Sequence, residues 1–315
     1  MQARSLYVLA PKKVEWIAEE LPELGVHEVL VQTTTGESSI GSELPRYSGT
    51  ARSSSLPKYP VMTGYENVGT VLARGSEVKR VHPGVQVVCF YGHRTHAVIP
   101  ESKVIRVPDE ISDELALLTI LTCDCAKGVR KVMPRPEEAV LVSAAGAIGL
   151  MTLFILRAYG VLHVDVVEME PQRHELARKL GARRVLLPNE LPESSETYTV
   201  SFECTSRNAA FALLQWNLKP EGRLCVLADG NYEPLQLTPA FHEKELSLFA
   251  SSDGWNYQEH AAWFFQVAGQ SGLEALFEWR VSAQELPDVF ERLVQGEMRP
   301  VKVLVSYEPQ RASGR

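Results

Sequence analysis

The sequence has 315 residues, of which 45% are hydrophobic and 23% are charged, and its formal net charge is −7. This composition is ordinary for a globular chain, and the length is sufficient for two domains with separate cores. The acidic balance without a long block of like charge argues against nucleic acid as a partner.

The N-terminal run MQARSLYVLAPKK has no apolar segment followed by a small-residue cleavage site, so it does not resemble a secretory signal. The longest nearly apolar stretch, residues 144–156, is too short to cross a bilayer. The five cysteines form no C-x-x-C pair and fit reduced thiols. We therefore expect a cytoplasmic protein with no membrane partner.

Short strand-like runs separated by Gly and Pro fill the first hundred residues, for example 28–33, 69–72, 85–90 and 96–100. Residues 45–60 are polar and rich in Ser and Pro, which predicts an exposed loop. This part of the chain is expected to form a β-rich domain.

From residue 139 onward, apolar strand-like runs alternate with amphipathic helical runs. Strands are predicted at 140–143, 164–169, 184–187, 200–205, 223–229 and 245–251, with helices following 143, 169 and 205. Such alternation indicates a parallel, doubly wound sheet buried on both faces. Two further helical segments and a terminal strand at 301–306 follow, and such a strand often returns to an earlier domain.

The run VLVSAAGAIG (140–149) places Gly146 and Gly149 between a buried strand and a helix. Glycine lets the backbone approach a pyrophosphate, and the helix N-terminus favours its negative charge. Glu168 ends the second strand, where a carboxylate can bind ribose hydroxyls and repel a 2′-phosphate, which favours NAD over NADP. Ala144 replaces the usual first glycine, and Glu170 is an alternative to Glu168.

Five further segments stand out along the chain: GYENVGTVLARGSEVKRVHPGVQVV (64–88), VPDEIS (107–112), EMEPQRHELARKLGA (168–182), FECTS (202–206) and KPEGRLCVLAD (219–229). They resemble, in the same order, segments of the medium-chain dehydrogenase/reductase superfamily, in particular its zinc-type alcohol, sorbitol and threonine dehydrogenases. The resemblance implies an α/β fold with a GroES-like β-rich substrate domain, residues 1–120 and 256–315, and a Rossmann dinucleotide-binding domain, residues 121–255. The predicted cofactor-binding residues are Ala144, Gly146, Ala147, Ile148, Gly149, Glu168, Arg173 and Thr205.

The sequence departs from the family at the catalytic zinc. The positions that match the three zinc ligands are Ile40, Tyr65 and Ile120, and the lobe with four structural-zinc cysteines has no counterpart. Isoleucine offers no donor atom, whereas Zn²⁺ needs three protein N, S or O ligands. We therefore predict a zinc-free protein with no metal-binding residues. His93 and His96 form H-x-x-H, but in an extended segment they would point to opposite faces.

Without zinc, hydrogen-bond donors must polarise the substrate carbonyl while the nicotinamide carries the hydride. Tyr65 takes the position of the lost histidine, and Ser42 matches the proton-relay Ser/Thr of related enzymes. Glu43 and Glu66 match acidic positions near the family's metal, as a base or as buried structural acids. Each of the four also has a purely structural interpretation.

The predicted function is zinc-independent, NAD-dependent hydride transfer between nicotinamide and a secondary alcohol or ketone. An NADPH-dependent enone or quinone reductase is the alternative, since SAAGAIG (143–149) is close to the turn of those enzymes. A non-catalytic dinucleotide-binding homologue is a third possibility. The strand at 245–251 is similar to the edge strand that pairs across the two-fold axis in related dehydrogenases, which predicts a homodimer.

Overall fold

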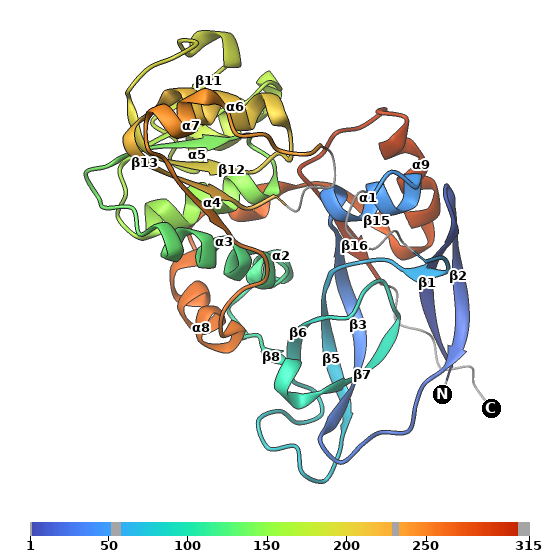
Figure 1. Ribbon diagram of the computed structural model, residues 1–315. Helices are drawn as coiled ribbons and strands as arrows, with labels where there is room; N and C mark the ends of the chain where they lie inside the picture. The colour runs from blue at the N-terminus through green and yellow to red at the C-terminus, as the bar shows by residue number, and fades with distance from the viewer. Residues whose placement is uncertain (1, 52–57, 229–232, 308–315) are drawn as a thin grey trace, which may run out of the picture. The chain divides into compact units, whose positions relative to one another are not determined.

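The computed structural model describes residues 2–51, 58–228 and 233–307 of the chain (Figure 1). It divides into two compact units, residues 1–119 with 276–315 and residues 120–275. The second unit extends beyond the predicted domain end at 255 because helix α8 (Tyr257–Ala268) packs within it. In α8, the ring of Phe264 packs edge-on against Phe154, and His260 Nε2 lies 3.0 Å from Thr122 Oγ1.

The second unit is the doubly wound α/β unit. The sheet formed by its described residues has the order β11-β10-β9-β12-β13-β14, and every pairing is parallel. The strands are β9 (Ala139–Ser143), β10 (His163–Val167), β11 (Arg184–Leu186), β12 (Tyr198–Glu203), β13 (Leu218–Val226) and β14 (Ser247–Ala250). The helices besides α8 are α3 (Thr119–Val132), α4 (Ala147–Ala158), α5 (His174–Lys179), α6 (Asn208–Asn217) and α7 (Pro239–Glu243). The predicted Rossmann fold is thereby confirmed, although Asp229, the end of one predicted strand, lies outside the described residues.

The first unit is the β-rich unit, and its main sheet has the order β15-β16-β3-β5-β6-β8, with β7 also paired to β3. The strands are β3 (Glu28–Ser38), β5 (Glu66–Arg74), β6 (Gln86–Phe90), β7 (His96–Pro100), β8 (Ile105–Arg106), β15 (Phe277–Ser282) and β16 (Lys302–Ser306). A smaller sheet contains β1 (Gln2–Ala10), β2 (Lys13–Glu20) and β4 (Val61–Met62). The predicted terminal strand does return: β16 pairs antiparallel with β3.

Three described helices belong to the β-rich unit, namely α1 (Ile40–Ser48), α2 (Asp113–Ala116) and α9 (Leu286–Val294). Helix α1 corrects the loop predicted at 45–60, since its last turn covers 45–48, and residues 52–57 of that segment lie outside the described residues. The helix ends at Gly49, whose φ of 74° is easily adopted by glycine.

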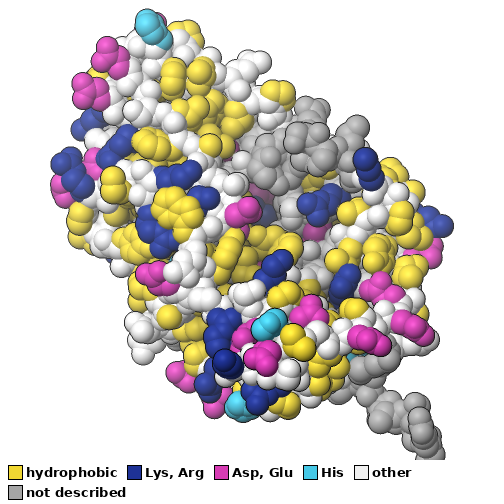
Figure 2. Space-filling model, turned by 60° about the horizontal axis from the view of Figure 1, so that its bottom comes forward, with side chains coloured by type: hydrophobic (Ala, Val, Ile, Leu, Met, Phe, Trp, Pro, Cys, Tyr) yellow, Lys and Arg dark blue, Asp and Glu magenta, His cyan; other side chains and the backbone are white. Residues whose placement is uncertain are grey.

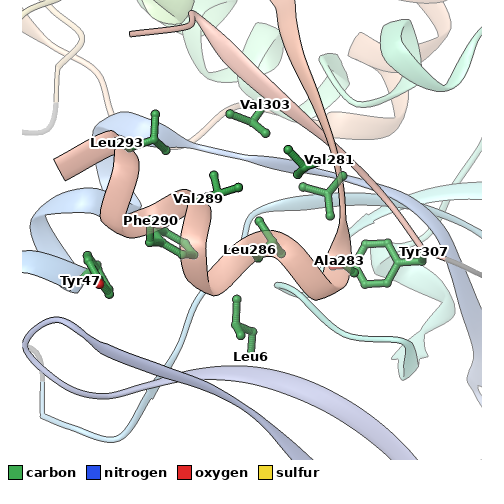
Figure 3. Close-up of a cluster of buried hydrophobic side chains, with 11 residues drawn as sticks. Leu6, Tyr47, Val281, Ala283, Leu286, Val289, Phe290, Leu293, Val303 and Tyr307 are labelled. Atoms are coloured by element: carbon green, nitrogen blue, oxygen red, sulfur yellow. The ribbon is translucent and has the colours of Figure 1, made fainter. Parts of the chain in front are cut away.

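One apolar core joins α1 and α9 to the strands of the β-rich unit (Figure 3). Tyr47 of α1 stacks on Phe290 of α9 with a ring-centroid distance of 5.3 Å. Val303 and Val305 of β16 lie in the same cluster and are fully buried. This packing explains why the first residues of the predicted loop, 45–48, are helical: the contacts of the buried Tyr47 stabilise the last turn of α1.

Charges of both signs are mixed on the protein surface. On the face shown in Figure 2, Lys and Arg side chains alternate with Asp and Glu among hydrophobic side chains. Among the described residues, no helix has the length and hydropathy needed to span a membrane.

Candidate functional site: a glycine turn and a buried acid network

The turn after β9 is the first part of a candidate cofactor site. Ala144 has a φ of 67°, the left-handed region that an L side chain rarely adopts, which explains why a glycine is common at this point. The Ala144 N–H donates to Val167 O at 2.7 Å, so the turn is fixed to the end of β10. The missing first glycine is therefore tolerated without loss of the turn.

The two remaining glycines of this turn have different surroundings. A Cβ at Gly149 would lie 1.9 Å from Ala144 O, so only glycine lets α4 approach the turn this closely. Gly146 is the N-cap of α4, and a Cβ there would meet no atom within 4 Å. Open space beside the first N–H groups of a 12-residue helix is the arrangement that accepts a phosphate group. The turn therefore fits a dinucleotide pyrophosphate.

Glu168 lies at the end of β10 and faces this turn. Its Oε2 accepts the Ala145 N–H at 2.5 Å, and its Oε1 accepts the Glu170 N–H at 2.8 Å. The side chain of Glu170 instead accepts a hydrogen bond from Gln172 Nε2 at 3.0 Å. Of the two acids that the sequence leaves open, Glu168 is thus the one in contact with the glycine turn.

The end of β12 lies beside the turn. Ser143 Oγ donates to Phe202 O at 3.2 Å and accepts the Cys204 N–H at 2.9 Å, which joins the ends of β9 and β12. The strand order reverses between these two strands, the position where doubly wound sheets bind ligands. Ser143 was not among the predicted site residues, because its bridging role depends on the pairing of strands distant in sequence.

Thr205 and Arg173 occupy separate places around this edge of the sheet. Thr205 accepts the Arg207 N–H at 2.9 Å, and its own N–H donates to Glu203 Oε1 at 2.7 Å. Burial raises the pKa of Glu203, against the effect of its hydrogen bonds from Thr205. Arg173 ends the short 3₁₀ segment Pro171–Arg173 after Glu170. The turn residues and Glu168 are thus brought into contact, while Thr205 follows the neighbouring strand.

In the β-rich unit, Glu43 is the centre of a buried acid network. It accepts the Ser39 N–H and the Thr63 hydroxyl, each at 2.6 Å, and its Oε2 lies 3.2 Å from His93 Nε2. Burial alone would raise the pKa of Glu43, but His93 and the hydrogen bonds outweigh it and hold the pKa below the usual value. A buried ionised carboxylate with these contacts holds α1, β4 and the turn after β6 together.

The network continues through His93, whose Nδ1 lies 3.1 Å from Tyr307 Oη. A buried ion pair between Lys302 and Glu37 lies on the paired strands β16 and β3. Burial raises the pKa of Glu37, although Lys302 acts in the opposite direction. His93 is fully buried within this network, whereas His96 Nδ1 lies 3.2 Å from Thr95 Oγ1.

The other three predicted catalytic residues are placed differently. The Tyr65 ring is half-buried and meets Phe90 edge-on at a centroid distance of 4.8 Å. Ser42 is half-buried in the first turn of α1, and its Oγ lies 3.3 Å from Ser39 O. Glu66 is fully buried at the start of β5.

The positions that match the family's zinc ligands carry no ligand set. Ile40 packs against the apolar core of Figure 3, and Ile120 is buried in α3. Across the part of the chain that the structure describes, no group of three or more His, Cys, Asp or Glu side chains is placed to hold a metal ion. The absence of zinc stays a prediction, which rests on the side chains at the matched positions.

Comparison with known proteins agrees with this architecture. The family model for zinc-binding dehydrogenases matches residues 147–264. An L-threonine 3-dehydrogenase from Anaeromyxobacter dehalogenans is 27% identical over 93% of this chain and 95% of its own length.

Two solved structures share the fold over nearly all of both chains. Galactitol-1-phosphate dehydrogenase from Escherichia coli has a TM-score of 0.84 at 20% identity, covering 96% of this chain and 99% of its own. A putative zinc-binding dehydrogenase from Sinorhizobium meliloti, solved with NADP bound, has a TM-score of 0.81 at 19% identity, covering 97% and 99%. Together with the doubly wound sheet and the glycine turn, these similarities support the medium-chain dehydrogenase/reductase superfamily.

Proposed function

We propose that this protein is a zinc-independent, NAD-dependent oxidoreductase that transfers hydride between nicotinamide and a secondary alcohol or ketone. The observation that carries the proposal is the glycine turn at the ends of β9 and β10, where Gly146 leaves space at a helix N-terminus and Glu168 lies against the turn. Related chains of similar length are named as threonine dehydrogenases, which supports an alcohol-oxidising activity.

In this proposal the dinucleotide supplies the hydride donor or acceptor. The N–H groups at the start of α4 hold the pyrophosphate, and Glu168 accepts the hydroxyls of the adenosine ribose. Each carboxylate oxygen of Glu168 accepts one backbone N–H and retains capacity for another donor. Thr205 and Arg173 complete the predicted contacts to the cofactor.

The preference for NAD is the part of the proposal most open to test, because one neighbouring structure holds NADP. The carboxylate of Glu168 would repel a 2′-phosphate. Calorimetric titration with each dinucleotide should give tighter binding for NAD(H). Equal affinities, or a preference for NADP(H), would contradict the role of Glu168 and favour the enone or quinone reductase alternative.

Zinc independence is supported by the side chains at the matched ligand positions. We expect the purified protein to contain no stoichiometric zinc and to keep its activity after treatment with a chelator. One zinc per chain that survives dialysis would contradict the proposal, and His93, His96 and Cys123 would then be tested as ligands.

Tyr65 is proposed as the donor that polarises the substrate oxygen, with Ser42 as a proton relay. Tyr65→Phe should lower turnover by about 10²-fold, the scale expected for the loss of one well-placed donor. The matched control is Tyr7→Phe, which removes a hydroxyl that donates to Glu19 at 3.3 Å on the β1–β2 sheet. Unchanged turnover in Tyr65→Phe would make Tyr65 a packing aromatic and direct the search to Ser42.

The two glutamates have different proposed roles. The contacts of Glu43 support a positioning role rather than that of a general base, because its oxygens already bind Ser39, Thr63 and His93. Glu66, which is also fully buried, is proposed as a second structural acid. A screen of secondary alcohols, ketones and enones with each cofactor would identify the substrate class, and no turnover with any of them would favour a non-catalytic binder.

The proposed assembly is a cytoplasmic homodimer joined through β14. This strand forms one edge of the described sheet, and Leu248 on it is 43% exposed. Pairing of two such edges would cover an otherwise open hydrogen-bonding edge. Light scattering should give the dimer mass, and a monomer mass at all concentrations would contradict this proposal.

A further inference from the structure

A second hollow lies in the α/β unit, away from the glycine turn. It measures about 410 Å³ and lies between α3, the end of α4 and the start of α8. Arg130, Tyr159, Trp255, His260 and Trp263 are among its lining residues. Hollows of this size hold small organic molecules.

The hollow is distant from the proposed dinucleotide site. Gly146 caps the N-terminus of α4, whereas Tyr159 caps its C-terminus. At 1.5 Å per residue, the intervening helix separates the two positions by about 18 Å. The residues of the hollow and those of the glycine turn are therefore different groups.

Flat aromatic rings form much of the wall. The ring centroids of Tyr159 and Trp263 lie 5.3 Å apart, and those of Trp263 and His260 are also 5.3 Å apart. Trp255 is 49% exposed, which is unusual for a large apolar side chain that costs free energy in contact with water. Such walls favour a ligand with a planar, apolar body.

Two cationic side chains lie close to the ring of Trp255. Lys127 Nζ and the Arg130 guanidinium carbon are 5.6 Å and 6.0 Å from the centre of the Trp255 ring. Glu259 is also in the lining and carries one negative charge, and its carboxylate accepts a hydrogen bond from Asn256 Nδ2 at 2.7 Å. Two cations against this one carboxylate favour an anion as the ligand.

Arg130 has donors that the described residues leave without a hydrogen-bond acceptor. Both Nε and Nη2 of Arg130 have no hydrogen-bond acceptor among these residues. These two nitrogens form one edge of the guanidinium, the edge that can bind a carboxylate through two parallel hydrogen bonds. The neighbouring Cys123 thiol is a poor acceptor, and burial raises its pKa to about 11. Because this edge is shielded from solvent, a ligand would reach it by displacing the half-exposed indole of Trp255 or turning the guanidinium.

His260 supplies a further unpaired polar atom. The exposed fraction of its side chain is only 3%. Its Nε2 contacts Thr122, whereas its Nδ1 has no hydrogen-bond partner among the described residues. Burial and the charge of Arg130 lower the pKa of His260 to about 4, so the ring is neutral at physiological pH. A neutral imidazole with a free nitrogen can donate to or accept from a ligand.

We propose that this hollow binds a small planar organic anion, an aromatic carboxylate, with the carboxylate on Arg130 and the ring between Trp255 and Trp263. The proposal goes beyond the oxidoreductase activity and does not depend on it. A cavity that combines aromatic walls, a guanidinium edge without an acceptor and a buried imidazole nitrogen has unpaired groups that such a ligand would satisfy.

The test is calorimetric titration of the full chain with 1-naphthoate and with the neutral 1-naphthalenemethanol, with and without added NADH. We expect the anion to bind at least about tenfold more tightly, since a charge-assisted pair with Arg130 distinguishes the two probes. Bound anion should also change the indole fluorescence. Equal binding of the two probes, no binding of either, or displacement of naphthoate by NADH would overturn the proposal.

Variants then locate the site. Arg130→Gln should weaken naphthoate binding by about tenfold, whereas Arg178→Gln, the same change at an exposed arginine of α5, should leave it unchanged. Thermal unfolding of each variant checks the fold. If Arg130→Gln does not fold, Trp255→Leu serves instead, because removing one flat wall should weaken naphthoate binding severalfold. Unchanged affinity in a folded Arg130→Gln or Trp255→Leu variant would place the anion elsewhere.

Discussion

Two buried carboxylates, Glu168 in the α/β unit and Glu43 in the β-rich unit, are held in different ways. Glu168 accepts hydrogen bonds from two backbone N–H groups, that of Ala145 in the turn after β9 and that of Glu170. Glu43 is bound by Ser39, Thr63 and His93, and His93 in turn contacts Tyr307.

The difference shows which kind of site a sequence reveals. The surroundings of Glu168 follow from strand order, because adjacent parallel strands bring their carboxyl ends to one edge. The surroundings of Glu43 are assembled from α1, β4, the turn after β6 and the segment after β16. The first acid lies at a sheet edge, where the proposed function places the cofactor, whereas the second joins distant segments.

The largest effect is expected at Glu43. Glu43→Gln should lower the free energy of unfolding by about 3 kcal/mol, since glutamine keeps only one of the two acceptor oxygens that Ser39 and Thr63 bind and so leaves a buried donor unsatisfied. Denaturant unfolding measures the change. Glu23→Gln, at an exposed position of the same unit, is the matched control and should differ from the parent by less than about 0.5 kcal/mol. A small change in Glu43→Gln would mean that the network does not stabilise the unit.

The pH dependence of stability sharpens the same comparison. Because the folded-state pKa of Glu43 lies below its unfolded value, its contribution is present above about pH 4.3 and is lost as the pH falls through the folded pKa. Unfolding midpoints measured between pH 7 and pH 3 should therefore fall more steeply for the parent than for Glu43→Gln. Parallel curves would contradict an ionised Glu43.

The glycine turn should respond next. Gly149→Ala should lower stability by about 2 kcal/mol, because its Cβ would lie 1.9 Å from Ala144 O and the turn must shift. Gly146→Ala is the matched control, since its Cβ enters open space and its backbone is extended. It should keep the parent's thermal midpoint and still weaken dinucleotide binding by occupying the approach to the helix N-terminus. Equal stability of the two variants would contradict this assignment.

The smallest effect on stability is expected at Glu168. Glu168→Gln keeps an oxygen that can accept the Ala145 N–H and should change the free energy of unfolding by less than about 1 kcal/mol. The proposed cofactor preference should nevertheless fall by about tenfold, or 1.4 kcal/mol. Titration with NADH and NADPH measures this ratio, and an unchanged ratio would assign the preference to other residues.

The sequence predicts the α/β unit well because its strands are buried on both faces and read as continuous apolar runs. The predicted strands at 140–143, 164–169 and 184–187 correspond to β9, β10 and β11. The glycine turn could be predicted because its residues are contiguous. The order of the sheet then explains why Glu168 faces it.

The β-rich unit was harder to predict, for physical reasons. Helix α1 was missed because Ser and Pro obscure its pattern, and its stability depends on Tyr47 stacking against Phe290, far along the chain. The H-x-x-H spacing drew attention to His93 and His96 as a pair, whereas His93 contacts Tyr307, 214 residues away. No local pattern encodes a contact of that separation.

The position of β16 has a consequence for how the chain folds during synthesis. This strand lies between β15 and β3 in the main sheet of the β-rich unit, yet it follows the entire α/β unit in sequence. The contiguous α/β unit can fold as soon as it leaves the ribosome, but β3 must wait for a neighbour more than 250 residues downstream, since Gly36 pairs with Val305. During that interval residues 35–38 of β3 lack this neighbour, although β7 already pairs with residues 28–32. Chaperone binding to nascent chains should be strongest then.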